Sequence, residues 1–365
     1  MSGKVIQISA GGLYSLALLD NGDVKGWGNN IQNQTTIPDF GGIKVKQIYA
    51  GDGTSFALLD DGTVCGWGLD SLFYGLITDI PNFLDKGKKV TQIAPGDFHV
   101  LAILDDGTID GWGDDSDGQI SRKPDFVALG RKVIQITCGA YHSLALLDDG
   151  TVVGWGSNKD RDFTTKCGQI DIPDFKGKKV KQIAAGDFHS FALLDDGTVR
   201  GWGSNINNDK IYTGQATPPD FSADGKIVTK ISAGGDHSLA LLDDGTVCGW
   251  GNNKYGQITD QHFLDNGKKI IQIDGGGDHS LALLDDGTVY GFGLNDDGQA
   301  NPKNFLLPLV HKIPIKYVPK VPVEPPLLSI SIMPSLVNNQ QIGGYKEKYL
   351  KYKQKYIQLK SGLNN

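Results

Sequence analysis

The segment Tyr141–Gly156, YHSLALLDDGTVVGWG, decides the fold, because near-copies of it occur seven times in the 365-residue chain. Its apolar run, Ser143–Leu147, is too short for a surface helix and suits a strand that is buried on both faces. Asp149 and Gly150 favour a tight turn, since glycine adopts positive φ at little cost. The Thr-Val pair that follows is β-branched and favours a return strand. The segment is therefore predicted to be a β-hairpin that ends at Gly-Trp-Gly.

The hairpin recurs with a period of 40 to 48 residues. A short strand of the type Val-x-Gln-Ile precedes each copy, and a Pro-Asp-Phe element or a relative follows most copies. The aromatic residues of the seven hairpin ends are Trp27, Trp67, Trp112, Trp155, Trp202, Trp250 and Phe292. Four short strands per repeat predict an all-β fold, a seven-bladed β-propeller of four-stranded antiparallel blades.

Two finer expectations concern the blade edges. Proline is tolerated at the start of an edge strand, so the Pro-Asp-Phe element is expected to form the outer strand. We also expect Val5–Ile8 to complete the last blade, because nothing after Pro302 repeats the Val-x-Gln-Ile strand.

The strand directions assign the loops to two edges of the ring. The Asp-Asp-Gly turns share one edge with basic loops such as Lys88-Lys89, so exposed ion pairs of about 0–1 kcal/mol each are expected there. The opposite edge carries the Ala-Gly-x-x-His loops and segments of unequal length after Gly-Trp-Gly. Binding residues often lie on loops that a rigid scaffold displays. We therefore expect a protein partner on this acidic, loop-bearing face, at Asp52, Asp97, Asp187, Asp236 and Asp278.

A histidine recurs at one repeat position, and serine follows it in four of five copies. These residues are His99, His142, His189, His237 and His279. A catalytic group is needed once, so a repeated one is interpreted as structural. The four cysteines form no Cys-x-x-Cys pair, and Asp114–Gly118 lacks the ligand series of a calcium loop. We expect no catalytic residue, metal or cofactor, and no enzyme activity.

Composition limits the cellular setting. The net charge of −7 argues against direct DNA binding by the propeller. Unpaired cysteines are typical of a reducing compartment. No apolar run approaches the roughly 20 residues that span a membrane, and the chain begins without a signal-peptide core. We expect an intracellular, cytoplasmic protein, with the nucleus as an alternative.

The repeat Ala185–Gly203, AGDFHSFALLDDGTVRGWG, with Gly214-Gln215 after it, resembles the repeat of the regulator of chromosome condensation (RCC1) family. The resemblance covers residues 1 to about 310 and implies a seven-bladed propeller. That family includes an exchange factor for a Ran-type GTPase that docks on nucleosomes, an ultraviolet receptor, ubiquitin-ligase subunits and interaction scaffolds.

Each of these functions predicts features that the sequence can be searched for. The tryptophans of the ultraviolet receptor are missing from the Ala-Gly-x-x-His loops, and we expect no additional catalytic domain of the ubiquitin-ligase type. We also expect neither the basic N-terminal tail nor the wedge insertion of the exchange factor, although the segments after Gly156 and Gly203 leave room for a short wedge. We expect a protein–protein interaction scaffold. The alternative is an exchange factor or chromatin-associated regulator for a Ran-like small GTPase.

Composition changes after the repeats and predicts three regions: a propeller at 1–307, a Pro-rich linker at 308–342 and a basic Lys/Tyr tail at 343–365. The linker is extended, or Leu327–Met333 adds an edge strand. Spacings of four and three residues predict a short amphipathic helix with one apolar stripe. The stripe consists of Tyr345, Tyr349, Tyr352, Tyr356 and Leu359.

A helix this short is marginal alone, so we expect it to order on a partner or by self-association. It can bind nucleic acid, an anionic membrane, another tail or the acidic propeller face, or it is a solubilising disordered end. The tail resembles the C-terminal tails of proteins from amoeba-infecting giant DNA viruses. That resemblance implies a viral protein made in a host cytoplasm or packaged in a virion.

Overall fold

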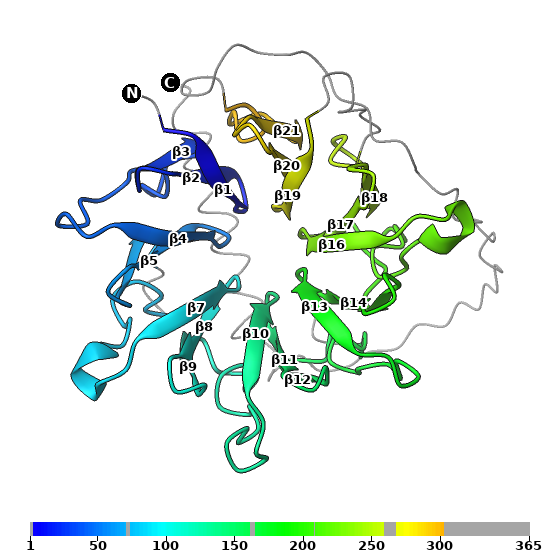
Figure 1. The fold of residues 1–365 in the computed structure, drawn as a ribbon, viewed down its shortest axis with the longest axis horizontal. Helices are drawn as coiled ribbons and strands as arrows, with labels where there is room; N and C mark the ends of the chain where they lie inside the picture. The colour runs from blue at the N-terminus through cyan, green and yellow to red at the C-terminus, as the bar shows by residue number, and fades with distance from the viewer. Residues whose placement is uncertain (1–2, 71–73, 161–164, 208, 259–267, 303–365) are drawn as a thin grey trace, which may run out of the picture. The chain divides into compact units, whose positions relative to one another are not determined.

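The structure, a computed structural model, describes residues 3–70, 74–160, 165–207, 209–258 and 268–302. These residues form seven three-stranded antiparallel sheets, blades one to seven in chain order, arranged in a ring (Figure 1). The first strand of each blade lies nearest the axis. The strands are β1 (Val5–Ala10), β2 (Tyr14–Leu19), β3 (Val24–Gly28), β4 (Val45–Ala50), β5 (Thr54–Leu59), β6 (Val64–Gly68), β7 (Val90–Pro95), β8 (His99–Leu104), β9 (Ile109–Gly113), β10 (Val133–Cys138), β11 (His142–Leu147), β12 (Val152–Gly156), β13 (Val180–Ala185), β14 (His189–Leu194), β15 (Val199–Gly203), β16 (Val228–Ala233), β17 (His237–Leu242), β18 (Val247–Gly251), β19 (Ile270–Gly275), β20 (His279–Leu284) and β21 (Val289–Gly293).

The blade count predicted from the sequence is confirmed, whereas the four strands per blade are wrong. The Pro-Asp-Phe elements turn instead of extending, because the aspartate side chain binds backbone N–H groups a few residues on. Asp39 Oδ1, for example, accepts from Gly41 N at 2.9 Å. Two of these elements include short 3-10 helices, η1 (Leu84–Lys86) and η2 (Phe221–Asp224).

The phenylalanine of the same element packs against the next blade. In five successive blades its ring centroid lies 6.0 to 6.2 Å from a tryptophan centroid of the following blade. The pairs are Phe40–Trp67, Phe83–Trp112, Phe126–Trp155, Phe175–Trp202 and Phe221–Trp250. The fourth element is therefore an aromatic wedge between blades and not an outer strand.

The expectation that Val5–Ile8 completes the last blade is also wrong. This strand pairs with β2 in blade one, with Ile8 opposite Ala17, while blade seven has its own first strand, β19. The ring closes through side chains, because the Gln272 amide binds both Ile8 N (3.0 Å) and Ile8 O (2.8 Å). Gln135 binds Ile183 in the same way within the ring, so the closure repeats an ordinary blade interface.

The core lies between blades. Every residue of the middle strands, such as β11, is buried, and each apolar cluster combines side chains of two neighbouring blades. Alanine occupies one middle-strand position in all seven blades and is fully buried there, as in Ala145. Blades therefore stabilise one another across both faces, which fixes the loops at either edge of the ring.

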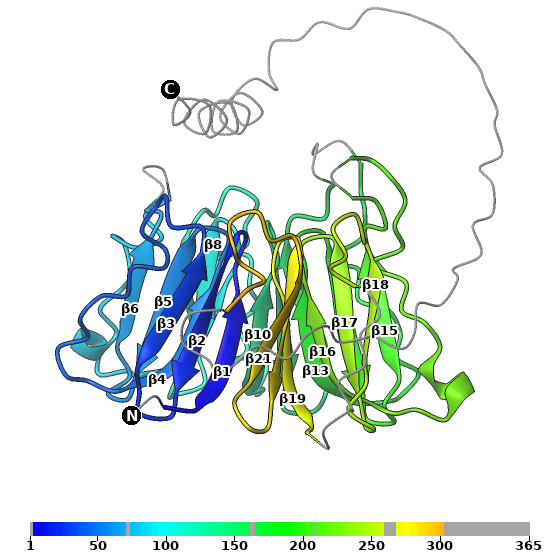
Figure 2. The same cartoon turned by 90° about the horizontal axis from the view of Figure 1, so that it is seen from above.

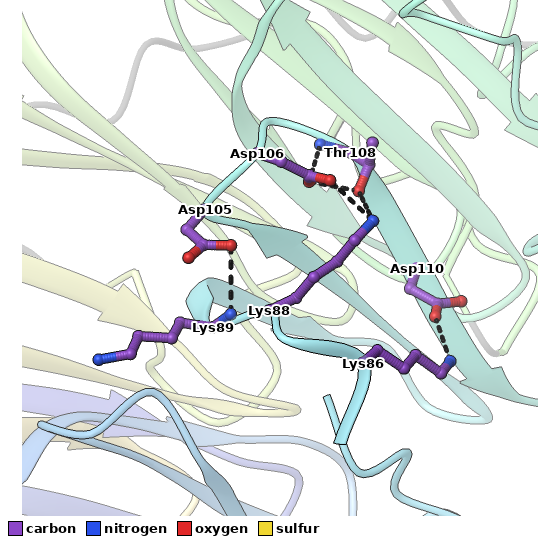
Figure 3. A network of polar contacts seen from close by, with 7 residues as sticks. All are labelled: Lys86, Lys88, Lys89, Asp105, Asp106, Thr108 and Asp110. Atoms are coloured by element: carbon purple, nitrogen blue, oxygen red, sulfur yellow. Dashed lines mark hydrogen bonds and ion pairs between the residues drawn. The ribbon is translucent and has the colours of Figure 1, made fainter. Parts of the chain in front are cut away.

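The edge with the Asp-Asp-Gly turns carries the predicted ion pairs (Figure 3). Lys88 Nζ lies 2.7 Å from Asp106 Oδ2, and Asp106 also accepts from the Thr108 hydroxyl and backbone. These contacts, the Lys88 bond first, lower the pKa of Asp106 to about 2. Matching pairs form in blades four, five, six and seven. Both partners are substantially exposed, so each pair contributes at most about 1 kcal/mol.

Candidate functional site

The opposite edge, which we call the loop face, carries the loops between the first and second strands and the segments that follow the third strands (the upper edge of the ring in Figure 2). In each blade the N–H that follows the third strand binds the carbonyl of one loop residue. Ser157 N, for instance, donates to Tyr141 O at 2.8 Å. This loop-tip residue directly precedes the histidine position and therefore has the same place in every blade. The seven loop-tip residues are Leu13, Gly53, Phe98, Tyr141, Phe188, Asp236 and Asp278.

The repeated histidines lie below the loop face and join neighbouring blades. His99 Nε2 lies 2.8 Å from Ser143 Oγ of the next blade. Ser143 Oγ donates to Gln119 O at 2.9 Å, and Trp155 Nε1 donates to the same oxygen at 2.8 Å. The equivalent histidine–serine pairs are His142–Ser190, His189–Ser238, His237–Ser280 and His279–Ser15.

The hydroxyl proton is committed to the glutamine carbonyl, so the histidine supplies the proton of the shared bond and is the neutral Nε2–H tautomer. Burial lowers the pKa of His99 to about 3. The structural role predicted for these histidines is thus confirmed by their contacts.

The first two blades use other residues at the histidine position. In blade one the Tyr14 hydroxyl donates to Thr54 O at 2.6 Å and accepts from Ser55 at 2.9 Å. In blade two the residue is Thr54, and the serine position of blade three is Val100. The glutamine is replaced by Leu76, whose carbonyl still accepts from Trp112 Nε1 at 2.9 Å.

The five aspartates predicted to bind a partner all lie on the loop face, but they do not occupy equivalent places. Asp236 and Asp278 are loop-tip residues of blades six and seven, whereas the other three lie one residue earlier in their loops. Asp52 is exposed and Asp236 is buried. The structure therefore shows no ring of matched carboxylates among the described residues, and partner binding by these aspartates stays a prediction.

A row of aromatic rings, which was not predicted from the sequence, lies on the same face. Centroids lie 4.9 Å apart for Phe98–Tyr141 and 6.1 Å apart for Tyr141–Phe188. Tyr74, from the segment after β6, extends the row with its centroid 5.5 Å from Phe98. We call Tyr74, Phe98, Tyr141 and Phe188 the aromatic arc. Its signal in the sequence was an aromatic residue before the histidine in three successive repeats.

The segment after β15 adds exposed apolar side chains to this face. Ile206 pairs with Tyr212 in an isolated bridge, and Asn207 N donates to Ile211 O at 2.9 Å, which forms a small hairpin-like turn. Ile206, Ile211 and Tyr212 are 52%, 58% and 60% exposed. We call these three the β15 loop patch. Clustered exposed apolar side chains of this kind often mark an interaction site.

The tail residues Tyr345, Tyr349, Tyr352, Tyr356 and Leu359, with the whole of 308–365, lie outside the described residues. In the part of the chain that is described, no helix is long and apolar enough to cross a membrane. Within the same residues no group of three or more histidine, cysteine, aspartate or glutamate side chains is placed to hold a metal ion.

The repeated blades with their inter-blade histidine and tryptophan bonds define a β-propeller of the repeat type. Residues 80–326 match the family model of the RCC1-like domain, and residues 5–34 and 45–74 match the regulator of chromosome condensation (RCC1) repeat. The chain belongs to the family of RCC1-like domain proteins.

Several solved structures share the fold. Prp20p from Saccharomyces cerevisiae is 21% identical with a TM-score of 0.59, over 80% of this chain and 83% of Prp20p. Human WBSCR16 is 23% identical with a TM-score of 0.60, over 78% of this chain and 88% of that one. The CRINKLY WD40 ectodomain of the Arabidopsis thaliana receptor kinase ACR4 is 20% identical with a TM-score of 0.60. The match covers 80% of this chain and 96% of the ectodomain. No curated protein sequence matches the chain.

Proposed function

We propose that this protein is a non-enzymatic interaction scaffold whose loop face binds a protein partner. The observation that carries the proposal is the aromatic arc, in which the partly exposed rings of Tyr74, Phe98 and Tyr141 lie in contact on one face and the buried ring of Phe188 supports them. Aromatic side chains are enriched at protein interfaces, because they bury a large area with few rotatable bonds. The inter-blade bonds below the arc hold these rings in place before a partner arrives, which limits the entropy lost on binding.

The β15 loop patch extends this surface outward from the arc, and the acidic loop tips Asp236 and Asp278 follow it around the ring. An apolar region beside a carboxylate region orients a partner as well as binding it. We propose that the accessible members of the predicted set act in this second way, as charged groups beside an apolar contact surface; these are Asp52, Asp97, Asp187 and Asp278, whereas Asp236 is buried.

A photo-crosslinking experiment tests the proposal. Benzoylphenylalanine replaces Tyr212 on the loop face, which is 60% exposed, and, as a control of matched exposure, Leu129, which is 59% exposed and lies two residues before Arg131 of the opposite edge. We expect one defined adduct from position 212 and none from 129, and we expect the combined change Ile206→Ser and Ile211→Ser to remove the adduct. Equal adducts from both positions, or none from position 212, would contradict the proposal.

A second candidate function comes from the structural neighbours. The Prp20p structure is described together with binding properties to Gsp1p and histones, and a further structure holds yeast RCC1 (Prp20) bound to Kap60. An exchange factor or chromatin-associated regulator for a Ran-like GTPase is therefore the alternative to a plain scaffold. Its test is the release of a fluorescent nucleotide from a Ran-like GTPase, and no acceleration on adding this protein removes it.

A further inference from the structure

A cavity of about 640 Å³ opens on the loop face between blades three and four. Asp117 and Arg122 line it from the segment after β9, and Ser157, Lys159 and Lys166 line it from the segment after β12. It adjoins the aromatic arc, because the backbone N–H of Ser157 binds the carbonyl of Tyr141. A partner that lies over the arc therefore reaches this cavity with a side chain.

The cavity is lined by three cations and one carboxylate. The aliphatic stem of Arg122 folds back over Gly118, where a Cβ atom would lie 2.3 Å from Arg122 Cδ. Gly118 has φ of +77°, which favours glycine, and the missing Cβ leaves room for this close approach of the Arg122 side chain. Within the described residues neither Arg122 nor Lys159 forms an ion pair, in contrast to the cations of the Asp-Asp-Gly edge. Lys166 pairs with Asp171 at 2.8 Å.

Ser157 differs from its counterparts in other blades. The residue at this position usually accepts a hydrogen bond from the N–H two residues on, as Asn29, Asp114, Ser204 and Asn252 do. In blade four the residue two positions on is Lys159, which forms a bridge with Lys166 instead. Ser157 is 4% exposed, and among the described residues its Oγ has no hydrogen-bond partner. A buried hydroxyl without a partner is costly, and a ligand oxygen beside it relieves that cost.

The charge and the donors point to the chemistry of the ligand. Three cations and one carboxylate line the cavity, and Asp171 neutralises Lys166, so one positive charge remains in excess and the ligand should be an anion. Several donors around one space match the three acceptor oxygens of a phosphoryl group better than the two of a carboxylate. Guanidinium and ammonium groups with a hydroxyl donor are the usual partners of phosphoryl oxygens. Asp117 is half-buried beside them, and its carboxylate can only accept hydrogen bonds. It therefore suits a peptide N–H next to a phosphorylated residue.

We propose that this cavity binds a phosphorylated side chain of the partner that docks on the loop face. Arg122, Lys159 and Lys166 contact the phosphoryl oxygens, Ser157 donates its hydroxyl proton, and Asp117 accepts from the adjoining peptide. The inference rests on the proposed function, because it assigns the phosphate to a protein partner. A free phosphate compound could supply the same phosphoryl group.

The test is fluorescence anisotropy with the full chain and a labelled, glycine-rich peptide that holds one phosphoserine. The unphosphorylated peptide and inorganic phosphate are the comparison ligands. We expect selective binding of the phosphopeptide, with affinity above that of inorganic phosphate. Arg122→Gln should weaken it about tenfold or more and Ser157→Ala about fivefold. Arg131→Gln, which removes the same charge at the opposite edge, should leave it unchanged.

Three results would overturn the inference: equal binding of the two peptides, wild-type binding by Arg122→Gln, or equal loss with Arg131→Gln. If the phosphopeptide binds no more tightly than inorganic phosphate, the phosphate does not belong to a partner side chain. The cavity is then a site for a free phosphate compound. Thermal unfolding of the Arg122→Gln and Ser157→Ala proteins checks that both variants are folded like the unmodified protein. Lys159→Gln is a further cavity variant, which should also weaken phosphopeptide binding.

The proposed function is tested apart from the cavity by repeating the Tyr212 crosslink after phosphatase treatment of the partner. An adduct that survives unchanged, and that Arg122→Gln also forms, overturns the phosphate inference and leaves the scaffold function standing. No adduct in any condition overturns the scaffold function, while selective binding of the phosphopeptide still supports the cavity as a phosphate site.

Discussion

The interface between blades three and four is polar at its centre, whereas the interface between blades two and three is apolar. In the first, His99 binds Ser143, and the Gln119 carbonyl accepts from Ser143 and Trp155. In the second, the same three positions hold Thr54, Val100 and Leu76. All three side chains are replaced together, although they come from two different blades. Of the replacements only Thr54 has a polar side-chain atom, a buried hydroxyl without a hydrogen-bond partner among the described residues.

What both interfaces keep is the tryptophan. Trp112 Nε1 donates to the Leu76 carbonyl at 2.9 Å, as Trp155 Nε1 does to the Gln119 carbonyl at 2.8 Å. A phenylalanine wedge also packs on each indole. The backbone carbonyl and the aromatic wedge therefore hold neighbouring blades together. Histidine and serine are lost together between blades two and three, whereas between blades one and two Ser55 is kept and binds Tyr14 in place of a histidine.

The largest expected effect is that of acid, because it acts on all five histidine interfaces at once. Burial lowers the pKa of four of these histidines to about 3 and of His237 to about 4, from 6.5. The unfolded chain therefore binds more protons between pH 6.5 and about 3, so the stabilisation is complete above pH 6.5 and is lost as the pH falls. Each histidine contributes up to about 1.4 kcal/mol per pH unit in that range.

One buried carboxylate opposes this trend. Burial raises the pKa of Asp274 to about 6, so its folded state binds the extra proton between pH 3.8 and 6, and this single group favours folding as the pH falls. Five histidines outweigh it. Denaturant midpoints measured from pH 7.5 to 4.5 should fall steadily below 6.5, and a flat profile would show that the histidines are not held neutral. The variant His99→Thr with Ser143→Val has four of the five buried histidines. Its stability should therefore fall less steeply with decreasing pH than that of the unmodified protein.

The next largest effect is the loss of a single tryptophan, which should be similar in the two kinds of interface. Trp155→Ala and Trp112→Ala each remove a buried indole and its bond to a backbone carbonyl, so each should lower the free energy of unfolding by about 3–5 kcal/mol. Chemical denaturation with a two-state fit measures both. A much smaller effect at Trp112 would mean that the apolar interface depends on its other side chains and not on the feature that both share.

A graft should expose the unit behaviour of the histidine–serine pair. Thr54→His alone places an imidazole against Val100, where its Nε2–H lacks the serine oxygen, and should destabilise by about 1–3 kcal/mol. Adding Val100→Ser should recover much of that loss, since the hydroxyl then accepts from the imidazole and donates to the Leu76 carbonyl. A double-mutant cycle on unfolding free energies measures this coupling. Additive effects of the two substitutions would mean that the paired replacement of these residues has no energetic basis.

The blades were predictable because their signals repeat. Seven copies of a hairpin with Gly-Trp-Gly at its end leave few other folds, and seven Val-x-Gln-Ile strands already supply one first strand per blade. The prediction for Val5–Ile8 is wrong because blade seven already has its first strand at Ile270–Gly275, so no strand is missing after Pro302. The error at the Pro-Asp-Phe elements has a different cause, since proline and a local pattern cannot show that Phe126 is held by Trp155 of the next blade.

The candidate site was predictable only to the level of a face. Aspartates such as Asp187 and Asp236 look alike in the sequence, but they lie at different places in their loops. Phe98 and Tyr141 are far apart in the chain and meet because the ring places equivalent residues side by side. The unpartnered hydroxyl of Ser157 follows from the bridge at Lys159, which no spacing of residue types shows.

The smallest effect is expected at the Asp-Asp-Gly edge, outside both kinds of interface. Lys88→Met removes the pair with Asp106, whose side chains are 35% and 42% exposed, and should change the free energy of unfolding by less than about 1 kcal/mol. Molar salt should abolish even this difference, because exposed charges are screened over a few ångströms there. Thermal unfolding of both proteins at low and high salt measures it. A loss as large as that of a tryptophan would mean that this edge, and not the core between blades, holds the ring together.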